Sequence, residues 1–125
     1  MMDMANTESV RLVMVAGESS GDQLAAVLLQ GARAHYAQVD SAGIVGDAMA
    51  AQGAQAWWSS QSLAVRGYFE PIKHLPRILK MRSELIERTV ALRPDVFIGV
   101  DAPDFNLGVE TKLRAQGVPT MHYVS

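Results

Sequence analysis

The chain has 125 residues, of which 49% are hydrophobic and 19% are charged, which is enough apolar material for one folded domain and too much for a disordered chain. It contains no cysteine and three histidines at unpaired spacing, which excludes disulfide scaffolds, thiolate zinc sites and cysteine nucleophiles and makes a metal site unexpected. The net charge is −2, so the chain lacks the overall positive charge that is typical of nucleic-acid-binding proteins. No apolar run approaches the ~20 residues that a membrane-spanning helix needs.

Residues 10–16 are nearly all apolar and rich in β-branched side chains, which predicts a strand buried on both faces. A glycine loop, Gly17–Gly21, follows this run. A helix is then expected as far as Tyr36, because leucine, valine and alanine recur at helical spacing, and Ser20 with Gln23 fits a capping box at its start.

The next segment predicts a second, weaker strand at 39–45 and a short helix at 47–52. Residues 54–62 are small or serine-rich and are expected to form a loop. This loop carries Trp57 and Trp58, which suit stacking on a sugar or a base, although such residues more often fill the edge of a core.

An apolar stripe at three- and four-residue spacing predicts a long helix that starts at Pro71 or Pro76 and ends before Pro94. The two prolines predict an irregular helix or a helical hairpin before Pro76. Three further elements are expected: a buried strand at 96–100, a helix at 107–116 and a last strand at 120–124. His122, inside that last strand, is expected to be a hydrogen-bonded core residue.

Strands alternate with helices along the chain, which predicts an α/β fold: a Rossmann-like, doubly wound parallel sheet with helices on both faces. We expect residues 1–9 to be a flexible amino terminus and residues 10–125 to form part of one such domain. The chain stops at the end of a strand, where a doubly wound domain ordinarily continues into a covering helix. Met121 and Val124 are therefore expected to be partly bare, and the open sheet is expected to invite self-association.

The first strand-end loop, residues 17–22, combines two glycines with the carboxylates of Glu18 and Asp22. Ligands of open parallel sheets bind outside the carboxyl ends of the strands, and glycine lets a backbone approach a ligand closely. The loop is neither a dinucleotide fingerprint nor a P-loop, because a Gly-x-Gly pair and a following lysine are absent. Its carboxylates suit sugar hydroxyls better than phosphate. The alternative is a tight turn in which Asp22 favours the helix dipole.

A second pair of carboxylates follows the strand at 96–100. Asp101 comes directly after this apolar strand, so its carboxylate is partly desolvated, which suits a general base. Asp104 adds a like charge three residues on. The alternative is that one of the two caps the helix at 105–116, which is the commoner role of such residues.

The segment 65–82 mixes cations with aromatic and aliphatic side chains, and five basic groups in 66–82 stand against Glu70 alone. Such a mixture suits a membrane interface or an anionic lipid. The side chains expected to contact lipid are Val65, Tyr68, Phe69, Ile72 and Leu75. The alternative, which fits residues 78–90 better, is a helix that packs its apolar stripe on the sheet and leaves a solvated basic face.

Several segments, in order, resemble the lipid-A-disaccharide synthase family, and together they span nearly all of residues 10–125. The family's opening Gly-Glu-x-Ser-Gly-Asp motif is matched by residues 17–22, and the most specific match is Pro94–Asn106. Shorter matches are Gly43–Gly46, Leu63–Gly67, Lys73–Pro76 and His122–Ser125. The loop after the second expected strand, residues 43–47, has the sequence Gly-Ile-Val-Gly-Asp. The family usually has Gly-Ile-Gly-Gly-Pro there, so Val45 and Asp47 depart from it.

The resemblance implies a two-domain GT-B glycosyltransferase, of which this chain is most of the amino-terminal, acceptor-side half, without the second, donor-binding domain. It implies an inverting reaction between UDP-2,3-diacylglucosamine and 2,3-diacylglucosamine 1-phosphate that makes a β-1,6 link and releases UDP, with no cofactor and no essential metal. The chain alone is expected to be inactive. Asp101 matches the family's catalytic aspartate. The substrate-binding positions implied are Gly17, Glu18, Ser19, Gly21, Asp22, Asp104 and Asn106.

Both substrates of that reaction carry acyl chains, so the resemblance also implies a cytoplasmic protein bound peripherally to the inner face of the inner membrane. The polar residues 1–10 agree with this, because they lack the basic and then apolar order of a signal peptide. Two alternatives stay open. One is a non-catalytic α/β module that binds a nucleotide or a sugar, in which Asp101 is dispensable. The other is a basic lipid-binding adaptor that rests on residues 65–82 alone.

Overall fold

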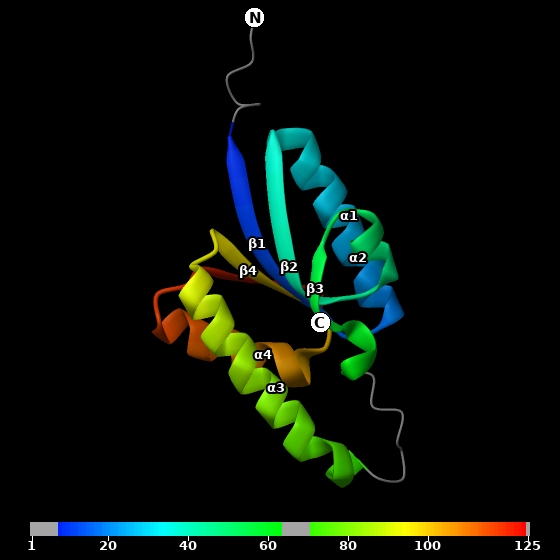
Figure 1. Ribbon diagram of the computed structural model, residues 1–125, viewed down its shortest axis with the longest axis vertical. Helices are drawn as coiled ribbons and strands as arrows, with labels where there is room; N and C mark the ends of the chain where they lie inside the picture. Colours follow the sequence, from blue (N-terminus) through cyan, green and yellow to red (C-terminus); the bar gives the residue numbers. More distant parts are fainter. Residues whose placement is uncertain (1–7, 64–70, 125) are drawn as a thin grey trace, which may run out of the picture.

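The computed structural model describes residues 8–63 and 71–124, with residues 71–74 described by their backbone alone (Figure 1). Five parallel strands form one sheet in the order β3-β2-β1-β4-β5. The strands are β1 (Ser9–Ala16), β2 (Gln38–Val45), β3 (Gln55–Ser59), β4 (Val96–Val100) and β5 (Thr120–Tyr123). The predicted Rossmann-like α/β fold is therefore confirmed.

Helices cover both faces of this sheet, as the alternation of elements predicted. They are α1 (Ser19–His35), α2 (Asp47–Ala51), α3 (Pro71–Leu92) and α4 (Pro103–Ala115), with a 3₁₀ turn at Ser60–Ser62. Helices α1 and α2 pack on one face, and α3 and α4 pack on the other (Figure 1). This arrangement leaves the carboxyl ends of the strands as the edge at which the loops gather.

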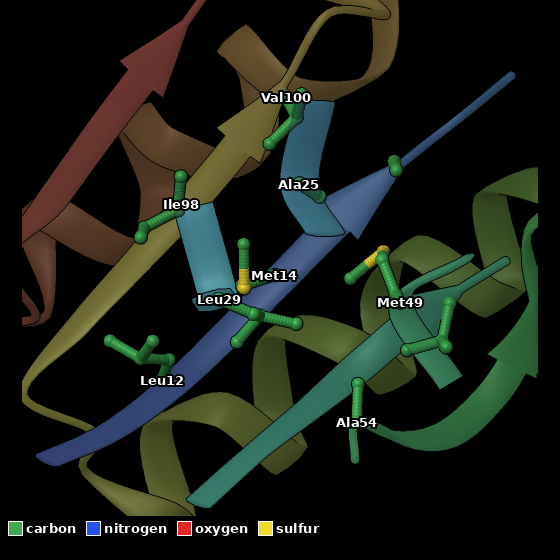
Figure 2. Packing of buried hydrophobic residues seen from close by; sticks show 10 residues of the cluster. Leu12, Met14, Ala25, Leu29, Met49, Ala54, Ile98 and Val100 are labelled. Carbon is green, nitrogen blue, oxygen red and sulfur yellow. The ribbon is translucent and has the colours of Figure 1, made fainter. Parts of the chain in front are cut away.

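Side chains of the central strand β1 alternate between two hydrophobic cores. Met14 packs with Leu29 of α1 and Met49 of α2 in the first core (Figure 2). Val13 and Val15 belong to the second core, beneath α3 and α4. Both faces of β1 are thus buried, which explains why its sequence is a continuous apolar run and not an alternation of apolar and polar residues.

The structure contains one strand that the sequence analysis missed. Residues 55–59, expected to be loop, form the edge strand β3, which pairs with β2 across an irregularity next to Gly43. Trp57 and Trp58 are half-buried and pack against the second core, so the prediction that they fill a core edge is confirmed. The guanidinium carbon of Arg88 lies 4.3 Å from the centre of the Trp57 ring, a cation–π contact that holds α3 against β3.

The start of the chain differs slightly from the prediction. Strand β1 begins at Ser9, inside the segment expected to be flexible, and residues 1–7 lie outside the described residues. The predicted capping box is wrong, because α1 begins at Ser19 with Glu18 as its N-cap and no side-chain cap bond.

Helix α3 begins at Pro71, one of the two predicted starts, and is more regular than expected. It runs without interruption through Pro76, whereas an irregular helix or hairpin was predicted before that residue. Pro76 lies near the amino-terminal end of the helix, where its missing N–H removes a single hydrogen bond. Further along α3, Met81 and Leu85 are buried in the second core.

The other edge of the sheet is partly bare. Strand β5 pairs with β4 on one side, and Met121 and Val124 are 49% and 45% exposed. The prediction that these two side chains are incompletely covered is confirmed.

Candidate functional site

Two of the strand-end loops meet at one place. Strands β1 and β4 are parallel neighbours, so residues 17–22 and residues 101–106 leave the sheet at the same edge. A Cβ atom added to Gly17 would stand 2.9 Å from the Cβ of Ala102, which is closer than side chains tolerate. Glycine at position 17 therefore permits the two loops to touch, and they form a single site.

A pocket of about 540 Å³ opens between these loops and the amino-terminal half of α3. Its ionisable side chains are those of Glu18, Asp101, Asp104 and Arg82. Its apolar wall consists of Leu63, Leu75, Ile78, Leu79, Ala102, Pro103 and Phe105. Three carboxylates beside an apolar wall suit a ligand that joins hydroxyl groups to an alkyl portion, because the carboxylates accept hydrogen bonds and the wall excludes water.

A second pocket, of about 630 Å³, lies toward the amino ends of β1 and β2, where Arg11, Asp40, Trp57 and Arg88 contribute to its lining. It is the larger of the two, but no strand-end loop reaches it. The carboxyl ends of parallel strands are where such folds bind their ligands, so we take the pocket at Asp101 as the candidate site.

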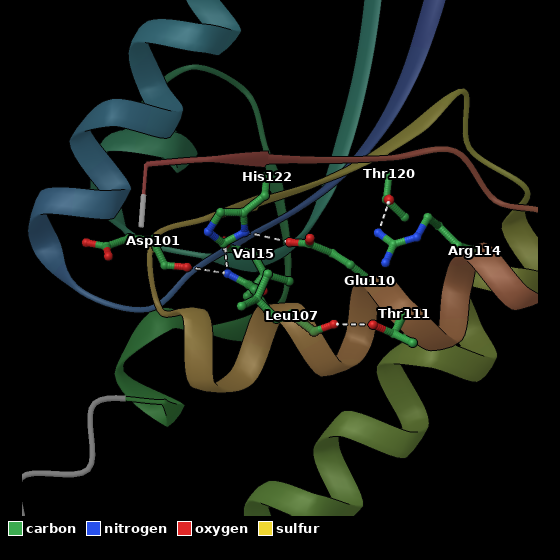
Figure 3. A network of polar contacts seen from close by, with 9 residues as sticks. Val15, Asp101, Leu107, Glu110, Thr111, Arg114, Thr120 and His122 are labelled. Carbon is green, nitrogen blue, oxygen red and sulfur yellow. Dashed lines mark hydrogen bonds and ion pairs between the residues drawn. The ribbon is translucent and has the colours of Figure 1, made fainter.

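Asp101 is half-buried at the end of β4 and has a left-handed backbone, with φ of 59°. Its N–H donates to the carbonyl oxygen of Tyr123 at 3.0 Å, and its own carbonyl oxygen accepts from Nδ2 of Asn106 at 2.9 Å. The carboxyl group points away from these bonds (Figure 3). The backbone of Asp101 is thus fixed by hydrogen bonds while its carboxylate lines the pocket.

The structure decides against the capping alternative for both carboxylates. Helix α4 begins at Pro103, four residues before the predicted start at 107, and its N-cap is Ala102 with no side-chain cap bond. Proline favours the first helical position, because its missing N–H has no partner there anyway. Asp104 is exposed in the first turn of α4 and also lines the pocket.

The other predicted residues of the first loop divide between the pocket and the helix behind it. Gly17 and Glu18 line the pocket, whereas Ser19 is the exposed first residue of α1. A Cβ atom on Gly21 would lie 3.5 Å from the Cβ of Asp101, so this glycine packs directly against the turn that carries the carboxylate.

Asp22 does not line the pocket. It is 7% exposed, and its two carboxylate oxygens accept hydrogen bonds from the backbone N–H groups of Ala48, at 2.8 Å, and Met49, at 2.9 Å. Gly46 leaves the room that this carboxylate occupies. Asp22 therefore joins α1 to the amino end of α2, where a negative charge also stabilises the helix dipole.

A buried polar cluster lies behind Asp101, on α4 and β5 (Figure 3). Asn106 and Glu110 are 0% and 2% exposed, and Oε2 of Glu110 lies 2.7 Å from Nδ1 of His122. The prediction of a hydrogen bond to His122 is confirmed, but the residue is half-buried and is not part of the core. Glu110 was not predicted, although its spacing of four residues from Asn106 puts both on the face of α4 that meets the sheet.

Arg82 and Leu79 were likewise missed as pocket residues. Both follow Leu75 at helical spacing on α3, so the apolar stripe that predicted the helix also pointed to this wall. The spacing alone did not distinguish residues that line a pocket from residues that pack on the sheet, because the same face of α3 does both.

Of the five residues expected to contact lipid, three, Val65, Tyr68 and Phe69, lie outside the described residues. Ile72 belongs to α3, where its backbone alone is described. Leu75 is 49% exposed at the mouth of the pocket. In the part of the chain that the structure describes, no helix has the length and apolar character needed to cross a membrane.

Comparison with known proteins finds one family. The sequence model of the lipid-A-disaccharide synthetase family matches residues 12–125. A lipid-A-disaccharide synthase of Chromobacterium violaceum is 53% identical over 117 residues, which is 94% of this chain and 30% of that protein. Those of Glaesserella parasuis and Xanthomonas campestris are 49% and 50% identical over 119 and 121 residues, or 95% and 97% of this chain. The chain spans 31% and 28% of their lengths, less than a third of each.

Proposed function

The chain belongs to the lipid-A-disaccharide synthetase family, and we propose that it supplies the acceptor-binding part of a glycosyltransferase of lipid A assembly. The proposed reaction joins UDP-2,3-diacylglucosamine to 2,3-diacylglucosamine 1-phosphate and releases UDP. One observation carries the proposal: Asp101, in the segment most specific to the family, ends a buried strand and lines a pocket with an apolar wall.

In the proposed mechanism, the carboxylate of Asp101 takes the proton of the 6-hydroxyl group of the acceptor. The hydroxyl oxygen forms a bond to the anomeric carbon of the donor sugar, and the bond from that carbon to the diphosphate oxygen breaks, so that UDP leaves with the electron pair. Attack from the face opposite the leaving group inverts the anomeric centre. This route needs one base and no covalent intermediate.

Other pocket residues support the same class of substrate. Glu18 and Asp104 offer carboxylate oxygens to sugar hydroxyls, and Arg82 adds one positive charge that suits the 1-phosphate of the acceptor. The apolar wall formed by Leu75 and Leu79 suits an acyl chain. A ligand with hydroxyl, phosphate and alkyl groups is thus matched by three different parts of the pocket lining.

We also propose that the protein binds the inner face of the inner membrane as a peripheral protein. Leu75 and Leu79 are 49% and 46% exposed on α3, and the cationic residues Arg77, Lys80 and Arg82 belong to the same helix. Each cation close to an anionic surface is worth about 1 kcal/mol, and the attraction falls off within a Debye length.

Membrane binding is tested with vesicles that contain phosphatidylglycerol. The protein is expected to bind these vesicles less tightly as salt is raised, because the charges are screened. Replacing both leucines, Leu75→Ser with Leu79→Ser, is expected to weaken binding at least about tenfold, because two apolar side chains no longer enter the bilayer. Leu107→Ser is the matched control, since Leu107 is 50% exposed on α4. Binding that is unaffected by salt and by the paired substitution would count against the proposal.

The transfer reaction is tested with both acylated substrates. A synthase of full family length that contains residues 1–125 as its amino-terminal part (the full-length synthase) is expected to release one UDP for each disaccharide formed. Residues 1–125 alone are expected to form none, because reactants must be aligned by groups on both sides of a cleft and this chain spans less than a third of its relatives. Disaccharide formation by residues 1–125 alone would contradict the proposed division of the enzyme.

Self-association is proposed for residues 1–125 in isolation. Met121 and Val124 leave apolar surface on an edge of the sheet, and exposed strand edges pair with other chains. Sedimentation of the isolated chain as a monomer over a wide range of concentrations would refute this.

A further inference from the structure

The side chain of Asn106 joins the ends of two strands beneath the pocket. It is completely buried, and its Nδ2 donates to the carbonyl oxygen of Asp101 at 2.9 Å and to that of Val15 at 3.4 Å. Both partners are carbonyl oxygens, so the donor end of the amide must face them. Asn106 thus links the end of β4 to the end of β1 through one side chain.

The turn that Asn106 holds is strained. Asp101 and Ala102 have φ of 59° and 43°, a left-handed region that residues other than glycine rarely adopt. Such backbone persists where the surroundings enforce it, and it concentrates at functional sites. Here the N–H of Asp101 is held by Tyr123 and its carbonyl oxygen by Asn106.

The amide of Asn106 has little freedom of its own. A Cβ atom on Gly99 would lie 2.8 Å from the Cγ of Asn106 and would also overlap the carboxylate of Glu110. Glycine in β4 therefore makes the space that both side chains share. Packed against this strand and hydrogen-bonded to two carbonyls, the amide is a rigid support and has no access to the pocket.

We propose that Asn106 is a positioning residue for Asp101: it fixes the left-handed turn and so the direction of the carboxylate. This replaces the substrate contact implied by the family resemblance, and it rests on the proposed role of Asp101 as general base. Proton transfer requires the base within hydrogen-bond reach of the hydroxyl, and a displacement of about 1 Å can cost about 10²-fold in rate.

A double-mutant cycle in the full-length synthase tests the inference. The four proteins are the wild type, Asp101→Asn, Asn106→Ala and the variant with both substitutions. Asn106→Ala is expected to lower kcat by about 10- to 100-fold with little change in the KM for the acceptor. In the Asp101→Asn background the same substitution is expected to cost nothing further, because the group that it positions is already gone.

A matched control separates positioning from general damage to the buried cluster. Glu110→Gln keeps the size of a side chain that packs beside Asn106 but contacts His122 and not Asp101, and it is expected to leave kcat near the wild-type value. If Asn106→Ala does not fold, Asn106→Ser enters the same cycle with the same expected loss, because its single hydroxyl donor cannot hold both carbonyl oxygens at once.

The outcomes distinguish this inference from the proposed function. If Asp101→Asn is inactive but Asn106→Ala turns over like the wild type, the positioning role is wrong and the catalytic role of Asp101 stands. Losses that multiply in the double variant, or an equal loss in Glu110→Gln, also overturn the positioning role. If Asp101→Asn keeps its activity, the proposed role of Asp101 as general base fails, and the positioning role of Asn106 fails with it.

Discussion

Asp101→Asn is expected to lower the kcat of the full-length synthase by about 10²–10⁴-fold, the usual contribution of a general base. Asparagine has nearly the same shape as aspartate but cannot take up the proton of the acceptor hydroxyl. The backbone bonds of Asp101 to Tyr123 and Asn106 do not involve its carboxylate, so they survive the substitution. The melting temperature is therefore expected to stay close to that of the wild type.

Asp104→Asn is the matched control for this prediction. Asp104 lines the same pocket three residues later, but it is exposed and belongs to the first turn of α4. Its substitution is expected to raise the KM for the acceptor more than it lowers kcat. If Asp101→Asn turned over normally, Asp101 would not be the general base of the reaction. If it lost activity together with its folded structure, Asp101 would be a structural residue.

Gly43→Ala is expected to lower the free energy of unfolding by roughly 3 kcal/mol or more, the range of the most disruptive single substitutions. Gly43 has φ of 141°, and a Cβ atom there would overlap the carbonyl oxygen of Met14. That oxygen belongs to the central strand β1, so neither strand can move away from the added methyl group without breaking the pairing of β1 with β2. Urea unfolding followed by circular dichroism measures the change.

Gly31→Ala, also a glycine-to-alanine substitution, is expected to have the opposite effect on the free energy of unfolding. Gly31 lies in α1, and a Cβ atom added there would meet nothing within 4 Å. Alanine is therefore expected to stabilise the protein by about 0.5–1 kcal/mol through its higher helix propensity. Equal effects of the two substitutions would show that the close approach at Gly43 does not limit stability.

A helix or strand was predictable from the sequence where the spacing of its own apolar residues indicates it. The apolar run of β1 and the stripe of α3 predicted both elements, and alternation predicted a parallel sheet. Strand β3 was missed because Gln55–Ser59 has no alternating pattern: it is an edge strand whose formation depends on pairing with β2 and on packing of Trp57. Such tertiary contacts are not encoded in the local pattern.

The site was predictable at Asp101 but not in its surroundings. A carboxylate after a buried strand marks the strand end, and the structure brings Asp101 into one pocket lining with Gly17 and Glu18. The start of α4 was misjudged, because the predicted helix left out Pro103, although proline often occupies the first position of a helix. The buried positions of Asp22 and Asn106 were not evident, because a motif does not reveal which polar side chains bind backbone groups.

We propose that Asp101 acts on an acceptor sugar bound at the strand-end pocket. A single-turnover experiment tests it most directly, with the full-length synthase in excess over the acceptor, because it separates binding from bond formation. Asp101→Asn is expected to bind the acceptor with an affinity within about threefold of the wild type but to form the disaccharide about 10²–10⁴-fold more slowly. Disaccharide formation at the wild-type rate, or loss of acceptor binding in a folded variant, would contradict it.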